Sequence, residues 1–310
     1  MGIPRAVTRP NQAMLLDDEW LFELDTDDRG LTENWQADHT YTDIAQWPGS
    51  VESHLALAKG AVHTGWHDTV VVWYERTFSL PPMVGSAPGK SLFQLTFGAC
   101  GYETRVWLNG TALKTIEGEM IHYGEYTSFS YELEETDLRA KNRLTVRIAD
   151  SMDAEIPRGK QELHVYKRGG IWYQTYTGAV RSVWLELVGR NRLRSRVGVV
   201  SIVDNNLVRI NLTTRIHDPG QYTIRLRVFG PNDPTTLVAE SDFSLWLDAG
   251  QKQQRLVIEV PNAKLWSPAE PPLYHLVGQL RDETGQGPRV ETHFGLRKVE
   301  ARGSRVYLNN

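Results

Sequence analysis

The chain has 310 residues, a formal net charge of −4 and an isoelectric point near 6.2. This balance argues against nucleic acid or an anionic membrane as the main partner, because such proteins carry a clustered basic surface. The sequence contains no run of apolar residues long enough to span a bilayer. The one basic run, residues 190–196, is expected to be a solvated connector.

The number of cysteines and the sequence of the N-terminus indicate the cellular compartment of the protein. A single cysteine, Cys100, excludes an internal disulfide framework and fits a reducing environment. It lies in an apolar segment, so we expect a small buried hydrophobic side chain. The first ten residues contain no apolar stretch of signal-peptide length. These features predict a cytoplasmic protein.

The aromatic content allows two interpretations. Ten Trp and twelve Tyr exceed what is usual for this length. Large rings fill the cores of β-sandwiches, but they also stack on flat ligands. We favour the core interpretation for most of them.

The first half of the chain alternates apolar and polar residues, which is typical of strands with two different faces. We predict strands at residues 70–78, 91–97, 104–108, 144–149 and 183–187. In the strand at 104–108, Trp107 points to one face and Val106 and Leu108 to the other. Asn109 and Gly110 then form a hairpin turn, since both tolerate positive φ.

A second strand series follows residue 195. Strands are predicted at residues 197–203, 207–214, 222–229, 254–260, 273–280 and 290–294. Their number and spacing are those of an immunoglobulin-like sandwich. No helical periodicity separates the strands, so the fold is expected to be all-β. Residues 304–308 resemble one more strand that lacks a partner, which either joins the second sandwich or begins a further domain.

Together these segments resemble the N-terminal region of glycoside hydrolase family 2, which includes β-galactosidases, β-glucuronidases and β-mannosidases. The segments that carry the resemblance are Trp47-Pro48-Gly49, Trp73-Tyr74-Glu75, Trp107-Leu108-Asn109-Gly110, Leu265-Trp266-Ser267-Pro268 and Phe294-Gly295-Leu296-Arg297. The resemblance implies a sugar-binding jelly-roll β-sandwich, galactose-binding-domain-like, at residues 1–190. It further implies an immunoglobulin-like sandwich at 191–300 and the start of a TIM-barrel domain at 301–310.

The resemblance also suggests where sugar binds. In similar family members a run like residues 156–161 lies on the side that faces the catalytic barrel. Arg158, Lys160 and Gln161 can donate hydrogen bonds to sugar hydroxyls or carboxylates. The alternative is that this loop only packs against the neighbouring domain. Trp172 and Tyr173 follow and offer a stacking surface, although burial is the simpler explanation.

His67 and Asp68 are a second candidate for the edge of the sugar-binding site. They lie at a position where some family members direct a residue toward the sugar. A surface ion pair is the simpler explanation of these two residues. Residues 124–129 and 177–181 depart from the usual family motifs, which leaves the particular sugar open.

Metal and cofactor sites are not predicted. The segment 150–153 lacks the run of oxygen ligands that a calcium site needs, and no His or Cys residues occur at zinc spacing. The acidic residues Glu132, Glu134, Glu135 and Asp137 read as a solvated face.

Retaining glycosidases use two carboxylates about 5–5.5 Å apart. The resemblance implies that both lie in a barrel after Asn310, so we expect this chain alone to be inactive. The leading hypothesis is the non-catalytic part of a family 2 glycosidase, whose partners are a β-glycoside and its own barrel, with homo-oligomerisation left open. The alternatives are a free-standing carbohydrate-binding protein and a two-sandwich structural or oligomerisation module.

Overall fold

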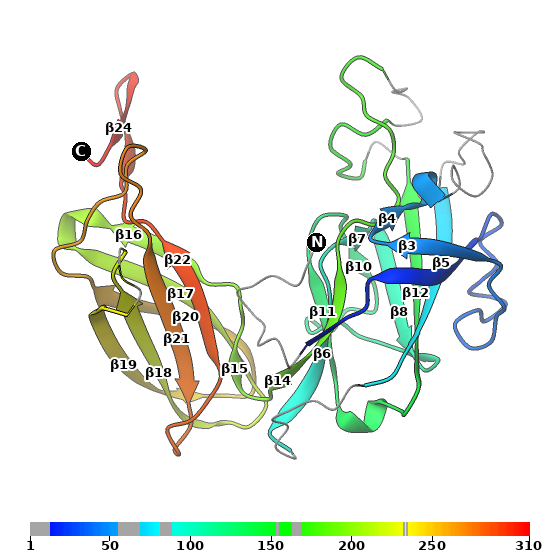
Figure 1. The fold of residues 1–310 in the computed structure, drawn as a ribbon, viewed down its shortest axis with the longest axis horizontal. Helices are drawn as coiled ribbons and strands as arrows, with labels where there is room; N and C mark the ends of the chain where they lie inside the picture. Colours follow the sequence, from blue (N-terminus) through cyan, green and yellow to red (C-terminus); the bar gives the residue numbers. More distant parts are fainter. Residues whose placement is uncertain are drawn as a thin grey trace. The chain divides into compact units, whose positions relative to one another are not determined.

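The computed structural model describes residues 13–54, 69–80, 89–152, 155–162, 169–231, 233 and 235–310. The chain divides into two compact units, with the division between Leu187 and Val188. Both units are built from antiparallel strands (Figure 1). Within the described ranges, helical structure is limited to short turns, at residues 51–54, η1 (Glu135–Asp137) and η2 (Val203–Asn205). No helix of these ranges is long and apolar enough to cross a membrane.

The first unit is a jelly-roll sandwich of two main sheets. The four-stranded sheet has the order β1-β14-β6-β11, and the larger sheet has the order β10-β8-β12-β5-β2-β3, with β9 paired to β8. A small third sheet, β4-β13-β7, lies at the end of the sandwich near the long connection that follows β12 (Figure 1). The strands of this unit are β1 (Ala13–Leu15), β2 (Asp18–Leu24), β3 (Asp43–Trp47), β4 (Gly49–Ser50), β5 (Thr69–Phe78), β6 (Ser91–Phe97), β7 (Cys100–Gly101), β8 (Glu103–Leu108), β9 (Thr111–Ala112), β10 (His122–Tyr123), β11 (Phe129–Leu133), β12 (Asn142–Ser151), β13 (Gly178–Ala179) and β14 (Val183–Gly189).

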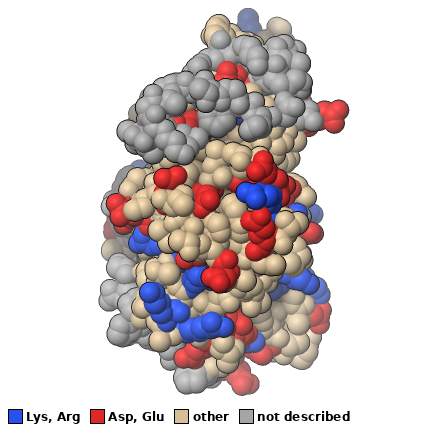
Figure 2. All heavy atoms as spheres, turned by 90° about the vertical axis from the view of Figure 1, so that its right-hand side faces the viewer, with Lys and Arg blue, Asp and Glu red and all other residues tan. Residues whose placement is uncertain are grey.

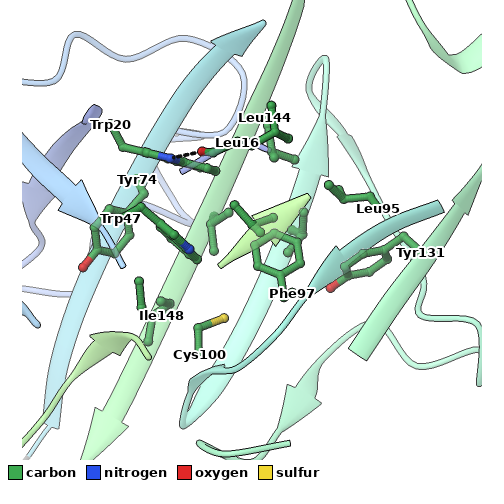
Figure 3. Close-up of a cluster of buried hydrophobic side chains, with 14 of the residues drawn as sticks. Leu16, Trp20, Trp47, Tyr74, Leu95, Phe97, Cys100, Tyr131, Leu144 and Ile148 are labelled. Atoms are coloured by element: carbon green, nitrogen blue, oxygen red, sulfur yellow. Dashed lines mark hydrogen bonds between the residues drawn. The ribbon is translucent and has the colours of Figure 1, made fainter. Parts of the chain in front are cut away.

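The core of the first unit lies between its two main sheets (Figure 3). Trp20 and Trp47 stack with their ring centroids 4.6 Å apart, and the indole of Trp20 donates a hydrogen bond to the Leu16 carbonyl at 2.8 Å. The buried indole N–H is therefore satisfied, as the burial of a polar group requires. Cys100 is a fully buried free thiol in this core, which confirms the expectation from the sequence.

A second, smaller cluster covers the outer face of the larger sheet. Trp73 and Trp107 stack with centroids 5.3 Å apart, and Trp35 and Tyr41 pack against them. Because side chains alternate along a strand, Trp73 joins this cluster while its neighbour Tyr74 joins the main core. The larger sheet thus buries side chains on both faces, which accounts for much of the aromatic content.

The hairpin at Asn109-Gly110 forms as the sequence predicts. Asn109 has φ 52° and Gly110 has φ 85°, and Leu108 pairs with Thr111 across the turn. Trp107 lies on the outer face, whereas Val106 and Leu108 lie in the main core.

The second unit is an immunoglobulin-like sandwich. One sheet has the order β15-β17-β16 with β20 paired to β17, and the other has the order β19-β18-β21-β22. Alternate residues of each central strand enter the core, as Val208, Ile210 and Leu212 do on β17. The strands are β15 (Arg192–Leu193), β16 (Gly198–Ile202), β17 (Leu207–Ile216), β18 (Gly220–Phe229), β19 (Leu237–Leu247), β20 (Gly250–Glu259), β21 (Tyr274–Arg281) and β22 (Arg289–Phe294).

The last two strands correct one expectation. The sequence predicts a strand at residues 304–308 without a nearby partner, but β24 (Arg305–Leu308) pairs with β23 (Val299–Arg302), the segment just before it. Gly303, with φ 59°, allows the tight turn between them. The hairpin is attached to the second unit by Lys298, whose ammonium donates to Asp204 Oδ2 at 2.8 Å. The strand therefore neither joins a sandwich sheet nor stands alone.

Candidate functional site

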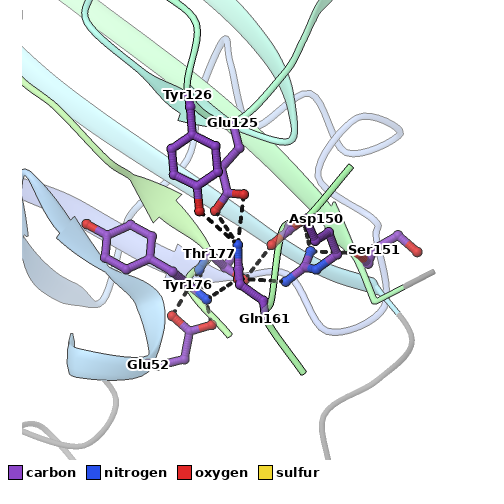
Figure 4. Close-up of polar contacts among 9 residues, drawn as sticks. Glu52, Glu125, Tyr126, Asp150, Ser151, Gln161, Tyr176 and Thr177 are labelled. Carbon is purple, nitrogen blue, oxygen red and sulfur yellow. Dashed lines mark hydrogen bonds and ion pairs between the residues drawn. The ribbon is translucent and has the colours of Figure 1, made fainter. Parts of the chain in front are cut away.

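Polar residues from five segments meet in the first unit, near the long connection between β12 and β13 (Figure 4). We call this set the polar network. Its members are Glu52 from the turn at 51–54, Glu125 and Tyr126 after β10, Asp150 and Ser151 at the end of β12, Arg158 and Gln161 in the loop after β12, and Tyr176 and Thr177 before β13. Such a buried assembly is stable only when its polar groups have partners.

Arg158 is the cation of the network and is only 3% exposed. Its guanidinium forms an ion pair with Asp150, and it donates to the Ser151 carbonyl at 2.7 Å and to Gln161 Oε1 at 3.2 Å. These contacts attach the loop at residues 155–162 to the C-terminal end of β12. A planar guanidinium is suited to this role because its donors have fixed directions.

Gln161 connects the loop to two other segments. Its Nε2 donates to both carboxylate oxygens of Glu125, at 2.8 and 2.9 Å, and to Tyr126 Oη at 3.0 Å. Its Oε1 accepts from the backbone N–H of Tyr176 at 2.7 Å. The side-chain amide is thus used as donor and as acceptor within the protein.

Thr177 closes the network on its far side. Its backbone N–H donates to both oxygens of Glu52 at 3.1 Å, and its hydroxyl donates to Asp150 Oδ2 at 2.9 Å. The next residue, Gly178, has φ 117°, and a Cβ there would lie 2.8 Å from Tyr74 Oη. The chain therefore needs glycine where it passes from the network into β13.

The network contains three buried carboxyl groups and one guanidinium, and that guanidinium pairs with Asp150. Burial raises the pKa of Glu52 and of Glu125. Burial raises the pKa of Asp150 to about 7, although Arg158 and the Thr177 hydroxyl oppose the rise. A buried charge is costly without a partner, so burial favours the protonated forms of Glu52 and Glu125, whereas Asp150 has Arg158 as its partner.

Outside the network, the same loops expose side chains to solvent. Lys160 is exposed, Tyr173 is 64% exposed, and Trp172 is half-buried. The backbone N–H of Tyr173 donates to the Lys160 carbonyl at 2.7 Å, and Glu162 N–H donates to the Tyr173 carbonyl at 2.7 Å. These bonds bring the backbones of two segments of the connection side by side, and Lys160 and Tyr173 are both exposed there.

The predicted sugar-contacting residues thus fall into three groups. Arg158 and Gln161 are buried with partners inside the protein, so the described structure uses them to fix the loop. Lys160, Trp172 and Tyr173 reach solvent to different extents. His67 and Asp68 lie outside the described residues. A contact between any of these side chains and sugar stays a prediction.

Sequence reasoning did not select the residues that complete the network. Glu125 and Tyr126 lie in the segment 124–129, which was noted only for its departure from the family motif. Asp150 was considered as a calcium ligand, but it pairs with Arg158 instead. Glu52 lies 125 positions before its partner Thr177, and no local pattern links the two.

The surface around the sandwich carries charges of both signs. Figure 2 shows acidic and basic side chains interspersed with uncharged surface on the face of the first unit that it presents. Among the described residues, no group of three His, Cys, Asp or Glu side chains is arranged to hold a metal ion. Glu134, Glu135 and Asp137 are exposed, as expected for a solvated acidic segment.

Comparison with known proteins identifies the second sandwich. Residues 193–297 match the family model of glycosyl hydrolases family 2. The second sandwich is therefore similar to a domain of this family. The resemblance recognised in the sequence is confirmed, and the β-glucuronidase of Paenibacillus borealis is 23% identical over 295 residues. That match covers 94% of this chain and 46% of the relative.

Solved structures agree on the fold across both units. The β-glucuronidase from Ruminococcus gnavus, in complex with uronic deoxynojirimycin, has a TM-score of 0.70 at 18% identity, covering 98% of this chain and 48% of that one. A family 2 member from Bacteroides cellulosilyticus has a TM-score of 0.66 at 17% identity, with coverage of 96% and 38%. The chain therefore spans about half or less of the length of these relatives.

Proposed function

We propose that this chain is the two-sandwich portion of a retaining β-glycosidase of the β-glucuronidase type. The observation that carries the proposal is the match of residues 193–297 to the family 2 model, together with the similarity of nearly the whole chain to β-glucuronidases. In this proposal the catalytic carboxylates belong to a further domain of the protein, and the two sandwiches hydrolyse nothing alone.

The role proposed for the first sandwich is to form one wall of the sugar pocket. The polar network anchors the described residues 155–162 after β12 to the segment just before β13, and Lys160 and Tyr173 are exposed to solvent beside it. An ammonium group is suited to a sugar carboxylate, and an aromatic ring is suited to a sugar face. Binding energy from such a wall aligns the scissile bond in the catalytic centre. The cytoplasmic location expected from the sequence remains part of the proposal.

Hydrolysis assays test this function. The protein expressed from its full gene is assayed with p-nitrophenyl β-D-glucuronide and p-nitrophenyl β-D-galactoside, beside the 310-residue chain alone. We expect cleavage of the glucuronide by the full protein and no cleavage by the chain alone. Cleavage of neither substrate by the full protein, or cleavage by the chain alone, contradicts the proposal.

Lys160 offers a more specific test. Lys160→Met removes the charge and keeps most of the apolar stem, so we expect the KM for the glucuronide to rise about tenfold with little change in stability. Lys141→Met, another exposed lysine of the same unit, is the matched control. Equal KM values for the two variants would remove Lys160 from the sugar pocket.

A further inference from the structure

Tyr126 combines an exposed ring with an anchored hydroxyl. The residue is 52% exposed, yet its Oη accepts a hydrogen bond from Gln161 Nε2 at 3.0 Å, and Gln161 itself is only 5% exposed. The Tyr126 hydroxyl also hydrogen-bonds to Glu125. Figure 4 shows the ring with its hydroxyl end directed at the network. The polar end of the side chain is therefore held while its aromatic surface remains accessible.

The backbone around Tyr126 is held as well. Gly124, with φ 133°, donates its N–H to the Tyr102 carbonyl at 3.0 Å. His122 Nε2 and Thr127 Oγ1 lie 3.3 Å apart, and the His122 ring stacks on Phe129 with centroids 3.9 Å apart. An exposed ring with a fixed backbone and a fixed hydroxyl loses little conformational entropy when a ligand binds.

More aromatic surface lies on the same segment. Tyr123 is 58% exposed, and its ring packs against Tyr102 with centroids 6.2 Å apart and an interplanar angle of 54°. Exposed aromatic side chains of this kind add apolar contact area without requiring a groove.

Tyr126 is also connected to the surface that carries Lys160 and Tyr173. Gln161 bonds Tyr126 through its side chain, and its backbone lies in a bridge with Tyr173. The backbone carbonyl of the neighbouring residue, Lys160, accepts a hydrogen bond from the backbone N–H of Tyr173. One side-chain amide thus joins the anchored ring to the loop that the proposed function places at the sugar.

We propose that Tyr126 is a stacking site for a pyranose ring, an inference that rests on the proposed function and extends it. A pyranose has an apolar C–H face for the ring and polar edges for an ammonium group, and Tyr126 and Lys160 supply these two partners from adjoining segments. Gln161 is the positioning residue, since it acts through the hydroxyl of Tyr126.

Kinetics of the full protein with two substrates test this site. Tyr126→Ala is expected to raise KM about tenfold for both methyl β-D-glucuronide and p-nitrophenyl β-D-glucuronide, with kcat nearly unchanged, because stacking contributes equally to the ground and transition states. Tyr126→Phe keeps the ring and loses the anchor, so a rise of about twofold to threefold is expected. Trp246→Ala, which removes an exposed aromatic side chain of the second unit, is the control and should change neither constant.

The outcomes separate the possible explanations. An effect of Tyr126→Ala on the p-nitrophenyl substrate alone would assign the ring to the aglycone and overturn the pyranose assignment. If the KM values of both Tyr126→Ala and Tyr126→Phe stay as unchanged as that of Trp246→Ala, the stacking site is overturned and the proposed function remains intact.

If the full protein hydrolyses no glycoside, binding of methyl β-D-glucuronide is measured by titration instead. Binding that Tyr126→Ala abolishes would support the site without the hydrolase function, and no binding would overturn both.

Discussion

At the scale of single residues, four buried charged groups of the first unit meet in the polar network. Arg158 and Asp150 are 3% and 2% exposed, and Glu52 and Glu125 are 4% and 3% exposed. Removing one partner from a buried charge pair leaves the other uncompensated, which costs far more than the pair contributes. The polar network is therefore where single substitutions have the largest effect on the loop after β12.

Arg158→Leu tests this dependence. We expect it to lower the free energy of unfolding of the first unit by about 3–5 kcal/mol, because the buried Asp150 carboxylate loses its cation. Lys160→Leu, two residues away on the exposed side of the loop, should change it by less than about 0.5 kcal/mol. Urea unfolding followed by tryptophan fluorescence measures both. Equal stability of the two variants would show that the ion pair is dispensable.

The pH dependence of stability follows from the raised carboxyl pKa of Glu125. A folded-state pKa above the unfolded value means that the folded protein holds the proton more tightly. The stability contributed by this group is therefore complete below its unfolded pKa and is lost as the pH rises through the folded value.

Glu125→Gln keeps the shape of the side chain and cannot ionise. The difference in unfolding free energy between Glu125→Gln and wild type should therefore grow in favour of the variant as the pH rises from about 4 toward neutral. Glu135→Gln, at an exposed position, should follow the wild type. Urea titrations at several pH values test this, and a constant difference across the range would refute it.

At the scale of elements, turns with positive φ fix the strand register. Asn109 adopts φ 52°, its Nδ2 donates to Asn142 Oδ1 at 3.1 Å, and its Oδ1 accepts from Arg143 N–H at 2.9 Å. The residue thus closes the β8–β9 hairpin and also joins it to the start of β12. A one-residue register shift would move Trp107 from the outer cluster to the main core, and Val106 and Leu108 from the main core to the outer face.

Substitutions at Asn109 separate the contribution of its side-chain hydrogen bonds from that of backbone strain at positive φ. Asn109→Ala loses the hydrogen bonds and strains the turn, so we expect a loss of about 2 kcal/mol in unfolding free energy. Asn109→Gly loses the same hydrogen bonds but tolerates positive φ. Its free energy of unfolding should therefore be about 1 kcal/mol higher than that of Asn109→Ala. Thermal unfolding of both variants tests this order, and a glycine variant no more stable than the alanine variant would rule out backbone strain.

At the scale of the whole molecule, the two units have separate cores. The core of the first unit contains residues from Leu16 to Leu187, and the core of the second contains residues from Leu193 to Leu296. A cavity in one core therefore removes contacts from that core alone.

Ile224→Ala in β18 tests this independence. It should destabilise the second unit by about 2–5 kcal/mol, because Ile224 is fully buried. Hydrogen exchange should accelerate in β17 and β21 and stay unchanged in β5 and β12. Accelerated exchange in the first unit would show that the two cores unfold together.

The sequence alone determined the class of fold. Short segments rich in β-branched and aromatic residues and bounded by turn residues placed the inner strands β5, β6, β8, β12 and β17 within a few residues of their observed bounds. Strand β19 was not predicted, because this edge strand is exposed along most of its length and mixes Ser, Glu and Asp with apolar residues. The partner of β24 was missed because β23 is short and mostly exposed.

Only the tertiary structure decided what the loop after β12 does. The sequence singled out Arg158 and Gln161 as informative, but their partners Glu125 and Asp150 come from other segments. Whether a polar side chain faces solvent or a buried carboxylate depends on long-range packing, which leaves no local period in the sequence. For the same reason, the sequence gives no sign that Gln161 holds the hydroxyl of Tyr126 while the ring stays exposed.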